Sequence, residues 1–253
     1  MSAERSESDG SNDVARTRAP STMNSVSDAA PPRCVACAQP RRGHGVTVAT
    51  YYLARALAGR GLRTLLMDLT GRRPSLQRLT NSAAVPNLTL WTPHIPTPER
   101  LADALSRARQ QATGRVDVML LDVDASYLER AGGVAAGIDY ILIFTEHSDT
   151  GMREVDQLAA RLDDEPPSRG SVAAVFSRVS LDSIENLPQA TRERGLPVLG
   201  EVPADYLLAT GDEYSLTSDE PRLPHDSYLG SISRLARALI QIAGIRATGR
   251  GVL

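Results

Sequence analysis

The amino-acid sequence predicts an α/β fold in which a doubly wound, mostly parallel sheet is flanked by helices on both faces. From Arg33 onward, short apolar segments alternate with segments of helical periodicity, an order that is typical of a parallel sheet with crossover helices. Two apolar segments, Val116 to Leu121 and Tyr140 to Phe144, contain almost no polar residues, as expected for strands covered on both faces. A glycine-containing turn joins the first expected strand, at residues 33–38, to the first expected helix.

The elements follow in a regular order along the chain. Strands are expected at residues 33–38, 63–67, 87–91, 116–121, 139–144, 171–176 and 197–199. Helices are expected near residues 47–59, 74–80, 98–112, 126–135, 150–162, 183–194 and 228–243. Two connecting segments, Asp163 to Gly170 and Thr217 to Asp226, contain prolines among charged residues and are expected to be surface turns.

One folded domain is expected between two tails. Residues 1–32 are rich in Ser, Asp, Ala and Pro, and they offer too little apolar surface to offset the entropy of ordering, which predicts a disordered N-terminal tail. Residues 33–246 then form the domain, and residues 247–253 form a flexible C-terminal tail. A chain of 253 residues is long enough to bury a sizeable core.

Composition limits the kinds of partner surface. The 28 residues counted as Lys or Arg are all Arg, 30 residues are acidic, and the formal net charge is -2. No overall field therefore favours DNA or an anionic membrane, and such a contact would need a local patch. No apolar run approaches the roughly 18 residues of a membrane span, and no signal-peptide pattern is present. A cytoplasmic location is expected.

Cys34 and Cys37 form a C-x-x-C pair, a spacing that also occurs in redox and metal sites. Residues three apart on a strand point to opposite faces of the sheet, however. There is no second cysteine pair, and the 4 histidines are scattered, so a zinc site lacks ligands. Both cysteines are expected to be buried structural residues.

The last helix carries an apolar stripe, which consists of Leu229, Ile232, Leu235, Leu239 and Ile242. Such a stripe either anchors a helix to a membrane or packs it against a sheet. The polar face of this helix offers only Arg234 and Arg237, so packing against the sheet is expected.

The turn after the first strand follows the order of a phosphate-binding loop, whose pattern is G-x-x-x-x-G-K-[ST]. Backbone N–H groups and the positive helix end of such a loop bind phosphate, and its glycines allow close approach. Gly43 and Gly45 can do this, and Thr47 stands where a Mg²⁺-binding hydroxyl belongs. Val46 occupies the lysine position, and the chain has no lysine to replace it.

Neighbouring residues supply only part of the missing charge. His44 is a weak replacement, since an ordinary imidazole is mostly neutral at pH 7. Arg41 and Arg42 are permanently charged and suited to phosphate, although they lie on the entrance side of the loop. We expect phosphate binding to persist and turnover to fall, because the lysine would stabilise the transition state.

Two further strands end in a carboxylate, at Asp68 and Asp122. Ligands of doubly wound sheets collect at the carboxyl ends of the strands, so both side chains are expected near the phosphates. One would orient water and the other would hold Mg²⁺. Asp is also common after strands simply because it favours turns. Here the glycine-containing turn, Asp68 and Asp122 all follow strands at the places that a nucleotide site requires, which disfavours that alternative.

Beyond residue 33 the chain resembles the ParA/MinD family of deviant-Walker P-loop ATPases. The family loop reads K-G-G-V-G-K-T-T, and residues 41–48 read R-R-G-H-G-V-T-V. The next family strand resembles L-L-I-D-x-D, and residues 65–70 read L-L-M-D-L-T. The family N-R-V is matched by S-R-V at 177–179, and its G-L-P-V-L-G-x-I-P-x-D is similar to residues 195–205.

This resemblance implies ATP and Mg²⁺ as cofactors and a homodimer as the working form. Nucleotide contacts would come from the loop and from three later positions: Arg41, Arg42, Gly43, His44, Gly45, Val46, Thr47, Val48, Ser177, Pro203 and Asp205. Thr47 and Asp122 would hold the metal, and Asp68 would be catalytic. Arg41, in the place of the family's signature lysine, would reach the phosphates of the partner in the dimer.

Three departures from the family pattern leave two functions open. Pro40 replaces the first loop glycine, Val46 the Walker lysine, and Ser177 the Asn that contacts adenine. The chain is then either a weak or conditional ATPase, a dimeric switch that partitions or positions cellular cargo, or a pseudo-ATPase scaffold with little hydrolysis. An unidentified protein partner is expected in both cases.

A third, minor alternative comes from Arg72 to Leu76, which resembles the D-L-R-R-P-S-L stretch of bacterial tyrosine kinases of polysaccharide export. Those kinases usually carry a C-terminal tyrosine cluster. The last tyrosine here is Tyr228, so the kinase-like function is disfavoured.

Overall fold

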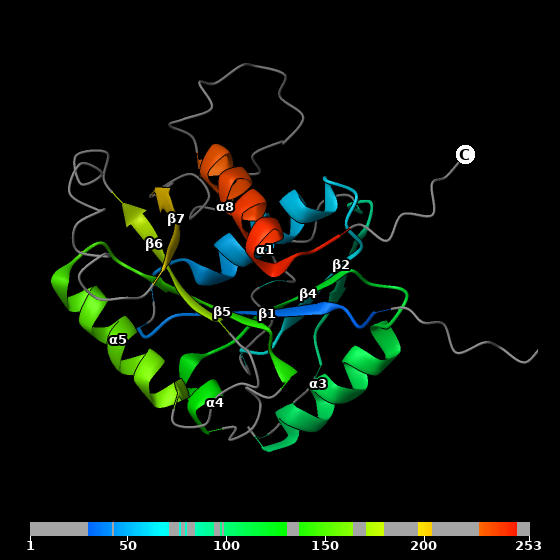
Figure 1. The fold of residues 1–253 in the computed structure, drawn as a ribbon, viewed down its shortest axis with the longest axis horizontal. Helices are drawn as coiled ribbons and strands as arrows, with labels where there is room; N and C mark the ends of the chain where they lie inside the picture. Colours follow the sequence, from blue (N-terminus) through cyan, green and yellow to red (C-terminus); the bar gives the residue numbers. More distant parts are fainter. Residues whose placement is uncertain are drawn as a thin grey trace, which may run out of the picture.

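In the computed structural model, the described part of the chain forms a seven-stranded parallel sheet with helices on both faces (Figure 1). The structure describes residues 30–41, 43–70, 76, 79, 84–93, 97, 99–130, 137–163, 171–179, 197–203 and 228–246. The fold class expected from the sequence is confirmed. The two expected tails lie almost entirely outside the described residues.

The strands are found within a few residues of their expected positions. They are Arg33–Ala38 (β1), Thr64–Asp68 (β2), Leu88–Trp91 (β3), Val118–Asp122 (β4), Tyr140–Thr145 (β5), Ser171–Val179 (β6) and Val198–Pro203 (β7). Their order across the sheet is β3-β2-β4-β1-β5-β6-β7. β1 therefore lies at the centre, between β4 and β5, and the turn that follows it opens at the middle of one sheet edge.

Helices cover the two faces of the sheet unequally. Helices α1 (Val46–Ala58) and α8 (Tyr228–Ala243) lie on one face, and α3 (Glu99–Ala112), α4 (Ala125–Arg130) and α5 (Asp149–Asp163) lie on the other (Figure 1). All five were expected, although α4 is described only to Arg130. The helices expected at 74–80 and 183–194 lie outside the described residues, except for Leu76 and Leu79.

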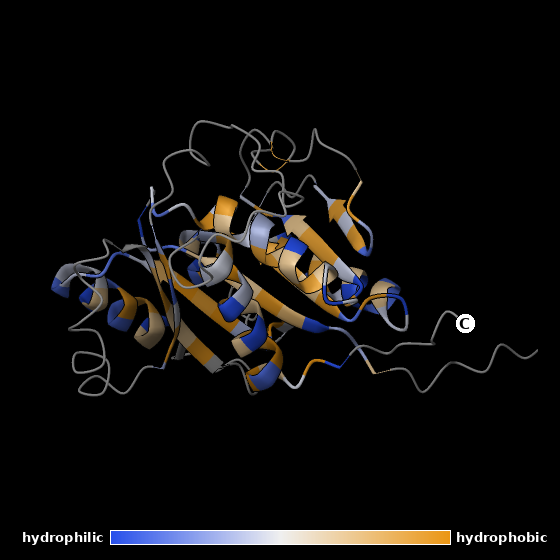
Figure 2. Ribbon diagram, turned by 90° about the horizontal axis from the view of Figure 1, so that it is seen from above, coloured by the Kyte–Doolittle hydropathy of each residue, from blue (hydrophilic) through white to orange (hydrophobic). Residues whose placement is uncertain are grey.

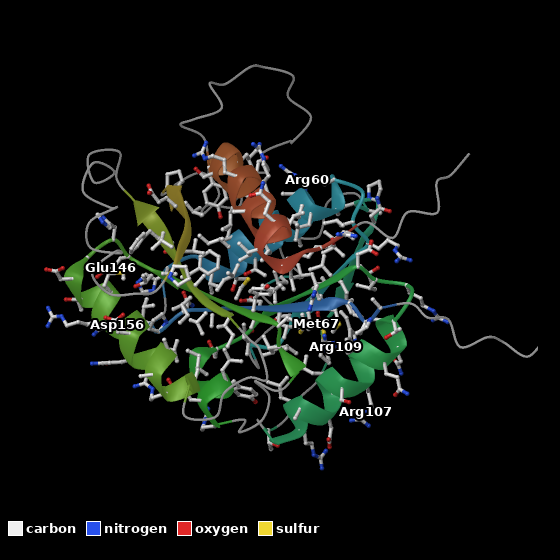
Figure 3. All side chains as sticks on the ribbon, in the orientation of Figure 1. Arg60, Met67, Arg107, Arg109, Glu146 and Asp156 are labelled. Atoms are coloured by element: carbon white, nitrogen blue, oxygen red, sulfur yellow. The ribbon has the colours of Figure 1, made fainter. Side chains whose placement is uncertain are left out.

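Each face of the sheet has its own apolar core. Alternate residues of β1 divide between them, with Val35 and Cys37 on the side of α1 and α8 and Cys34 on the other side. The strands form an apolar layer between the helices (Figure 2). In Figure 3, Met67 lies inside this layer, whereas Arg107 points outward from α3.

The expectation that Cys34 and Cys37 are buried on opposite faces is confirmed. Burial raises the pKa of each thiol to about 12. Since the thiolate is the reactive form of cysteine, neither side chain is a nucleophile or a ready metal ligand at neutral pH.

Paired charges account for the polar residues that interrupt the apolar segments. The Asp117 carboxylate accepts hydrogen bonds from the backbone N–H of Arg63 at 2.8 Å and from its Nη2 at 2.7 Å. The Asp139 carboxylate accepts from Arg109 Nη2 at 2.9 Å and from the backbone N–H of Cys34 at 2.8 Å. These pairs lie at the amino ends of the strands, opposite the edge where ligands collect, and they hold neighbouring elements in place.

Helix α8 packs against β7 and α1, as its apolar stripe predicts. Ile232, Leu235 and Leu239 are buried. Ile242 was expected in the same stripe, but it is 44% exposed, so this part of the prediction is wrong. Ala243 occupies the inward position of the last turn instead: the packed face runs through Ala236, Leu239 and Ala243, which leaves Ile242 at its border. Within the described residues, no helix is both long and apolar enough to cross a membrane.

Candidate nucleotide-binding site

Helix α1 begins after a glycine-containing turn, and its first N–H groups have no side-chain cap. Gly45, immediately before the helix, has φ 73° and ψ 19°, and Gly43 has φ 97°. These left-handed conformations favour glycine. No side chain caps the helix, so the N–H groups of its first turn stay available. A Cβ on either glycine would meet no atom within 4 Å, so there is space over the turn.

Two contacts of His44 lie within the turn. The backbone N–H of His44 donates to Gln39 Oε1 at 3.2 Å. The His44 Nδ1 lies 2.7 Å from the Arg41 carbonyl oxygen, and this contact requires the proton on Nδ1. His44 is only 9% exposed. The imidazole is therefore used to brace the turn. Arg42 lies outside the described residues.

The lysine position of the loop is filled by an apolar side chain that belongs to the core. Val46 is 3% exposed and packs with the residues between α1 and the sheet. Thr47 and Val48 are half-buried at the first turn of α1. The substitution thus removes a cation from the site and adds to the core beneath it.

Asp122, at the end of β4, is fully buried. Neither of its carboxylate oxygens has a hydrogen-bond partner in the described structure. Burial raises the pKa of Asp122 to about 7; the nearby Thr47 hydroxyl opposes this rise, and the carboxylates of Asp68 and Asp124 add to it. Thr47 is thus close to Asp122, although the two do not form a hydrogen bond. A buried carboxylate without a partner is costly, so Asp122 is a candidate ligand for a cation.

Asp68 lies next to Asp122 in the register of β2 and β4, so the two strand ends meet as expected. Its carboxylate already has partners, however. Oδ1 accepts hydrogen bonds from the Thr70 hydroxyl at 2.7 Å and the Thr70 backbone N–H at 3.2 Å, and Oδ2 accepts from the Leu76 N–H at 3.4 Å. In this structure the Asp68 carboxylate, at 4% exposure, is therefore engaged with Thr70 and Leu76.

Arg41 makes an ion pair with Glu154 of α5. The Arg41 side chain is 68% exposed, whereas that of Glu154 is 15% exposed. The guanidinium expected to reach across a dimer is therefore tied to its own subunit in this structure.

Two of the positions expected near the base, Ser177 and Pro203, lie in the carboxyl-terminal parts of β6 and β7. Ser177 is 3% exposed, and its hydroxyl donates to the Thr145 carbonyl at 3.2 Å. Pro203 ends β7. Asp205 lies outside the described residues. The Ser177 hydroxyl is therefore engaged with the neighbouring strand.

Sequence reasoning missed Gln39 and Glu154. Gln39 directly precedes the loop, but its part in the loop depends on the chain folding back so that its side chain meets the His44 amide. Glu154 lies far along the chain and meets Arg41 only because β1 and β5 are neighbours in the sheet. Neither residue stands in a local pattern that would have marked it.

The residues present fit Mg²⁺ bound together with phosphates. Mg²⁺ prefers oxygen ligands and is usually held by one or two protein groups plus substrate phosphates. The Thr47 hydroxyl and the unpartnered Asp122 carboxylate are such groups. Within the described ranges, no group of three or more His, Cys, Asp or Glu could hold a metal ion alone. A cation at this site would depend on phosphate oxygens to complete its ligands.

No protein-family model and no curated protein sequence matches this chain. Solved structures do match. A chain of the MinC:MinD cell division protein complex from Aquifex aeolicus has a TM-score of 0.67 and 16% identity, and the match covers 83% of this chain and 96% of that one. The septum site-determining protein MinD with Mg-ADP from Pyrococcus horikoshii OT3 has a TM-score of 0.65 and 14% identity, with coverages of 84% and 98%.

A ParA family ATPase from Chlorobium tepidum TLS has a TM-score of 0.60 and 19% identity, and the match covers 81% of this chain and 98% of that one. At these identities the match concerns the fold. The resemblance seen in the sequence motifs is confirmed at this level: the chain has the P-loop fold of the MinD and ParA ATPases.

Proposed function

We propose that this chain binds ATP with Mg²⁺ at the turn before α1 and acts as a weak or conditional ATPase. The observation that carries the proposal is Asp122, buried without a hydrogen-bond partner beside Thr47. The uncapped end of α1 attracts anions, but a carboxylate next to that end would repel them. A divalent cation between the carboxylate and a bound phosphate resolves the conflict.

The roles of the residues follow from their places around the turn. The N–H groups of residues 43–48 would bind the phosphates, and Thr47 and Asp122 would hold Mg²⁺. Bound Mg²⁺ would neutralise charge that develops on the phosphates. Arg41 and Arg42 add permanent charge near the turn. Ser177, Pro203 and Asp205 would lie on the side of the base.

Two observations support slow turnover. The lysine that would stabilise the transition state is replaced by Val46, whose side chain is in the core. The Asp68 carboxylate is occupied by Thr70 and the Leu76 N–H, so it would have to be released before it could orient water. The same observations favour a second candidate, a pseudo-ATPase scaffold that binds nucleotide without appreciable hydrolysis.

We infer a working form that is a cytoplasmic homodimer with a further protein partner, acting in the partitioning or positioning of cellular cargo. The support is the fold shared with a MinC:MinD cell division complex and with a ParA family ATPase. In such a dimer Arg41 would leave Glu154 and turn to the phosphates of the other subunit. The net charge of -2 gives no support to DNA or membrane as the working surface.

Thermal unfolding with and without Mg·ATP tests the proposed site. A ligand at 100 times its dissociation constant stabilises a protein by about 2.7 kcal/mol, which raises the Tm of a domain of this size by roughly 5 °C or more. We expect this shift in the wild-type chain and its loss in Asp122→Ala. Asp103→Asn, which changes an exposed carboxylate on α3, is the matched control and should keep the shift.

A full Mg·ATP shift in Asp122→Ala would overturn the metal assignment. The absence of any shift in the wild-type chain at millimolar Mg·ATP would overturn nucleotide binding altogether. Sedimentation velocity on the same samples reports the dimer. We expect a larger species with Mg·ATP than without nucleotide.

A further inference from the structure

The phosphate-binding turn already contains an acceptor for one of its own donors. Gln39 is the first residue after β1, and its side chain folds back so that Oε1 accepts the backbone N–H of His44 at 3.2 Å. His44 directly precedes Gly45 and the uncapped start of α1. Its N–H therefore belongs to the same row of donors that would bind a phosphate.

We propose that Gln39 sets the phosphate affinity of this turn by occupying the His44 N–H, so that a phosphate must displace the Gln39 carboxamide in order to bind. This inference rests on the proposed function, because it concerns the same site. It assigns to Gln39 an affinity-setting role that the sequence motif does not include.

Three features of the turn support a competitor rather than a brace. The turn has a separate brace, the contact between His44 Nδ1 and the Arg41 carbonyl at 2.7 Å, which does not involve Gln39. There is free space at Gly43 and Gly45, since an added Cβ on either would meet no atom within 4 Å. Gln39 is also only partly buried, so its side chain can turn toward solvent when it is displaced.

The strength of the contact predicts a moderate effect. A neutral hydrogen bond is weaker than one to a charged phosphate oxygen, so phosphate wins the competition but binds less tightly than it would at an empty donor. The net value of one neutral hydrogen bond corresponds to about a two- to tenfold change in affinity. The burial of Val46 makes this competition matter more, because no lysine at that position adds attraction for the phosphate.

The proposal gives the site a means of regulation. Any contact that takes the Gln39 carboxamide elsewhere, for example a hydrogen-bond donor from a bound protein, would raise phosphate affinity without touching the phosphate. The affinity of the site for nucleotide would then depend on whether such a protein is bound.

Titration of the full chain with inorganic tripolyphosphate, with and without Mg²⁺, tests the proposal. Tripolyphosphate has no base, so it reports on the turn alone. Gln39→Met keeps the length of the side chain without the acceptor, and we expect it to bind about two- to tenfold more tightly than the wild type. Gln39→Glu keeps the acceptor and adds a negative charge, and we expect it to bind at least about tenfold more weakly. Gln110→Met, at an exposed glutamine on α3, should match the wild type.

Hydrogen exchange of the His44 amide, followed by NMR on the same proteins, tests the contact itself. We expect faster exchange in Gln39→Met without ligand, and protection restored by tripolyphosphate. Equal or weaker binding by Gln39→Met while the wild type binds would overturn the proposal and leave the nucleotide site standing. If neither the wild type nor Gln39→Met binds millimolar tripolyphosphate, the Gln39 proposal and the proposed nucleotide site are both overturned. Removing the Gln39 acceptor would then have made no phosphate-binding donor available. Binding by Gln39→Met alone would show a fully blocked turn and support the proposal.

Discussion

Asp122 is a fully buried acidic residue at the candidate site. Its two oxygens are buried and unpartnered, and burial together with Asp68 and Asp124 raises its pKa to about 7 against the opposing effect of Thr47. The carboxyl is therefore largely protonated below pH 7 in the folded chain, whereas an unfolded Asp ionises near pH 4. Mg²⁺ needs the ionised form, so the proposed metal binding would be coupled to proton release at this residue.

The raised pKa predicts how stability depends on pH without Mg²⁺. Between about pH 4 and pH 7 the folded chain holds a proton on Asp122 that the unfolded chain has lost. This contribution to the unfolding free energy is complete below the unfolded pKa and is lost as pH rises through 7. Asp122→Asn cannot ionise, so between pH 5 and pH 8 the wild type should lose about 1–4 kcal/mol relative to this variant. Urea unfolding at the two pH values measures the difference.

Millimolar Mg·ATP provides the control for that experiment. Binding to the ionised carboxylate should recover much of the stability of the wild type at pH 8 and should leave Asp122→Asn almost unchanged. Parallel pH profiles for the two proteins without Mg²⁺ would show that Asp122 is not the buried, protonated group described above.

The buried position of Val46 determines how a lysine restored there would be accommodated. Its side chain is in the core, so Val46→Lys must bring the ammonium out to the turn or bury it. We expect the nucleotide-free variant to lose about 1–3 kcal/mol of unfolding free energy and to bind ATP at least about tenfold more tightly. Urea unfolding and calorimetric titration measure the two effects. Val46→Met, which is similar in length but uncharged, is the control.

If Val46→Lys binds ATP no better than Val46→Met, then the turn does not present this position to the phosphates. Pro40, which stands in place of the first loop glycine, would be the cause to examine next. Its ring restricts the backbone at the point where the loop leaves β1.

At the scale of single elements, α5 is packed tightly onto the end of β5. A Cβ at Gly151 would lie 2.4 Å from the Glu146 carbonyl oxygen and 2.6 Å from Thr145 Oγ1. Ser148 caps the same turn, since its hydroxyl accepts the Gly151 N–H at 3.0 Å. This junction places Glu154, three residues further on, beside Arg41. The start of α5 therefore helps to position the ion-pair partner of Arg41.

Gly151→Ala should destabilise the chain because the clash is with backbone and with a fully buried side chain. We expect a loss of about 2 kcal/mol or more of unfolding free energy, measured by urea unfolding. Gly137→Ala is the matched control, since a Cβ there meets no atom within 4 Å, and it should change stability by less than about 0.5 kcal/mol. Equal effects of the two substitutions would contradict the packing described for α5.

The secondary elements were predictable because their signals are local. Segments such as Tyr140 to Phe144 are apolar throughout, and a strand covered on both faces requires this. Ile242 shows the limit of such patterns. Its spacing from Leu239 allows a place on the packed face or at its border, and only the position of the sheet decides that Ala243 faces inward.

At the scale of the whole molecule, the candidate site was predictable only in outline. The Gly43–Gly45 turn, Thr47 and Asp122 could be found because a motif and a strand-end rule mark them. The occupied state of Asp68, the Arg41–Glu154 ion pair and the Gln39 contact could not, because each depends on segments that meet only after folding. The departure from the motif at position 46 likewise shows that the lysine is absent, but only the structure shows that the Val46 side chain packs in the core.

The proposed nucleotide site therefore keeps two candidate metal ligands, Thr47 and Asp122, and lacks the lysine. Isothermal titration of the wild-type chain with ATP, with and without Mg²⁺, tests this claim most directly. We predict binding in the micromolar to millimolar range that strengthens when Mg²⁺ is present, because Asp122 has no other partner for its charge. No heat of binding up to millimolar ATP, or equal affinity with and without Mg²⁺, would contradict it.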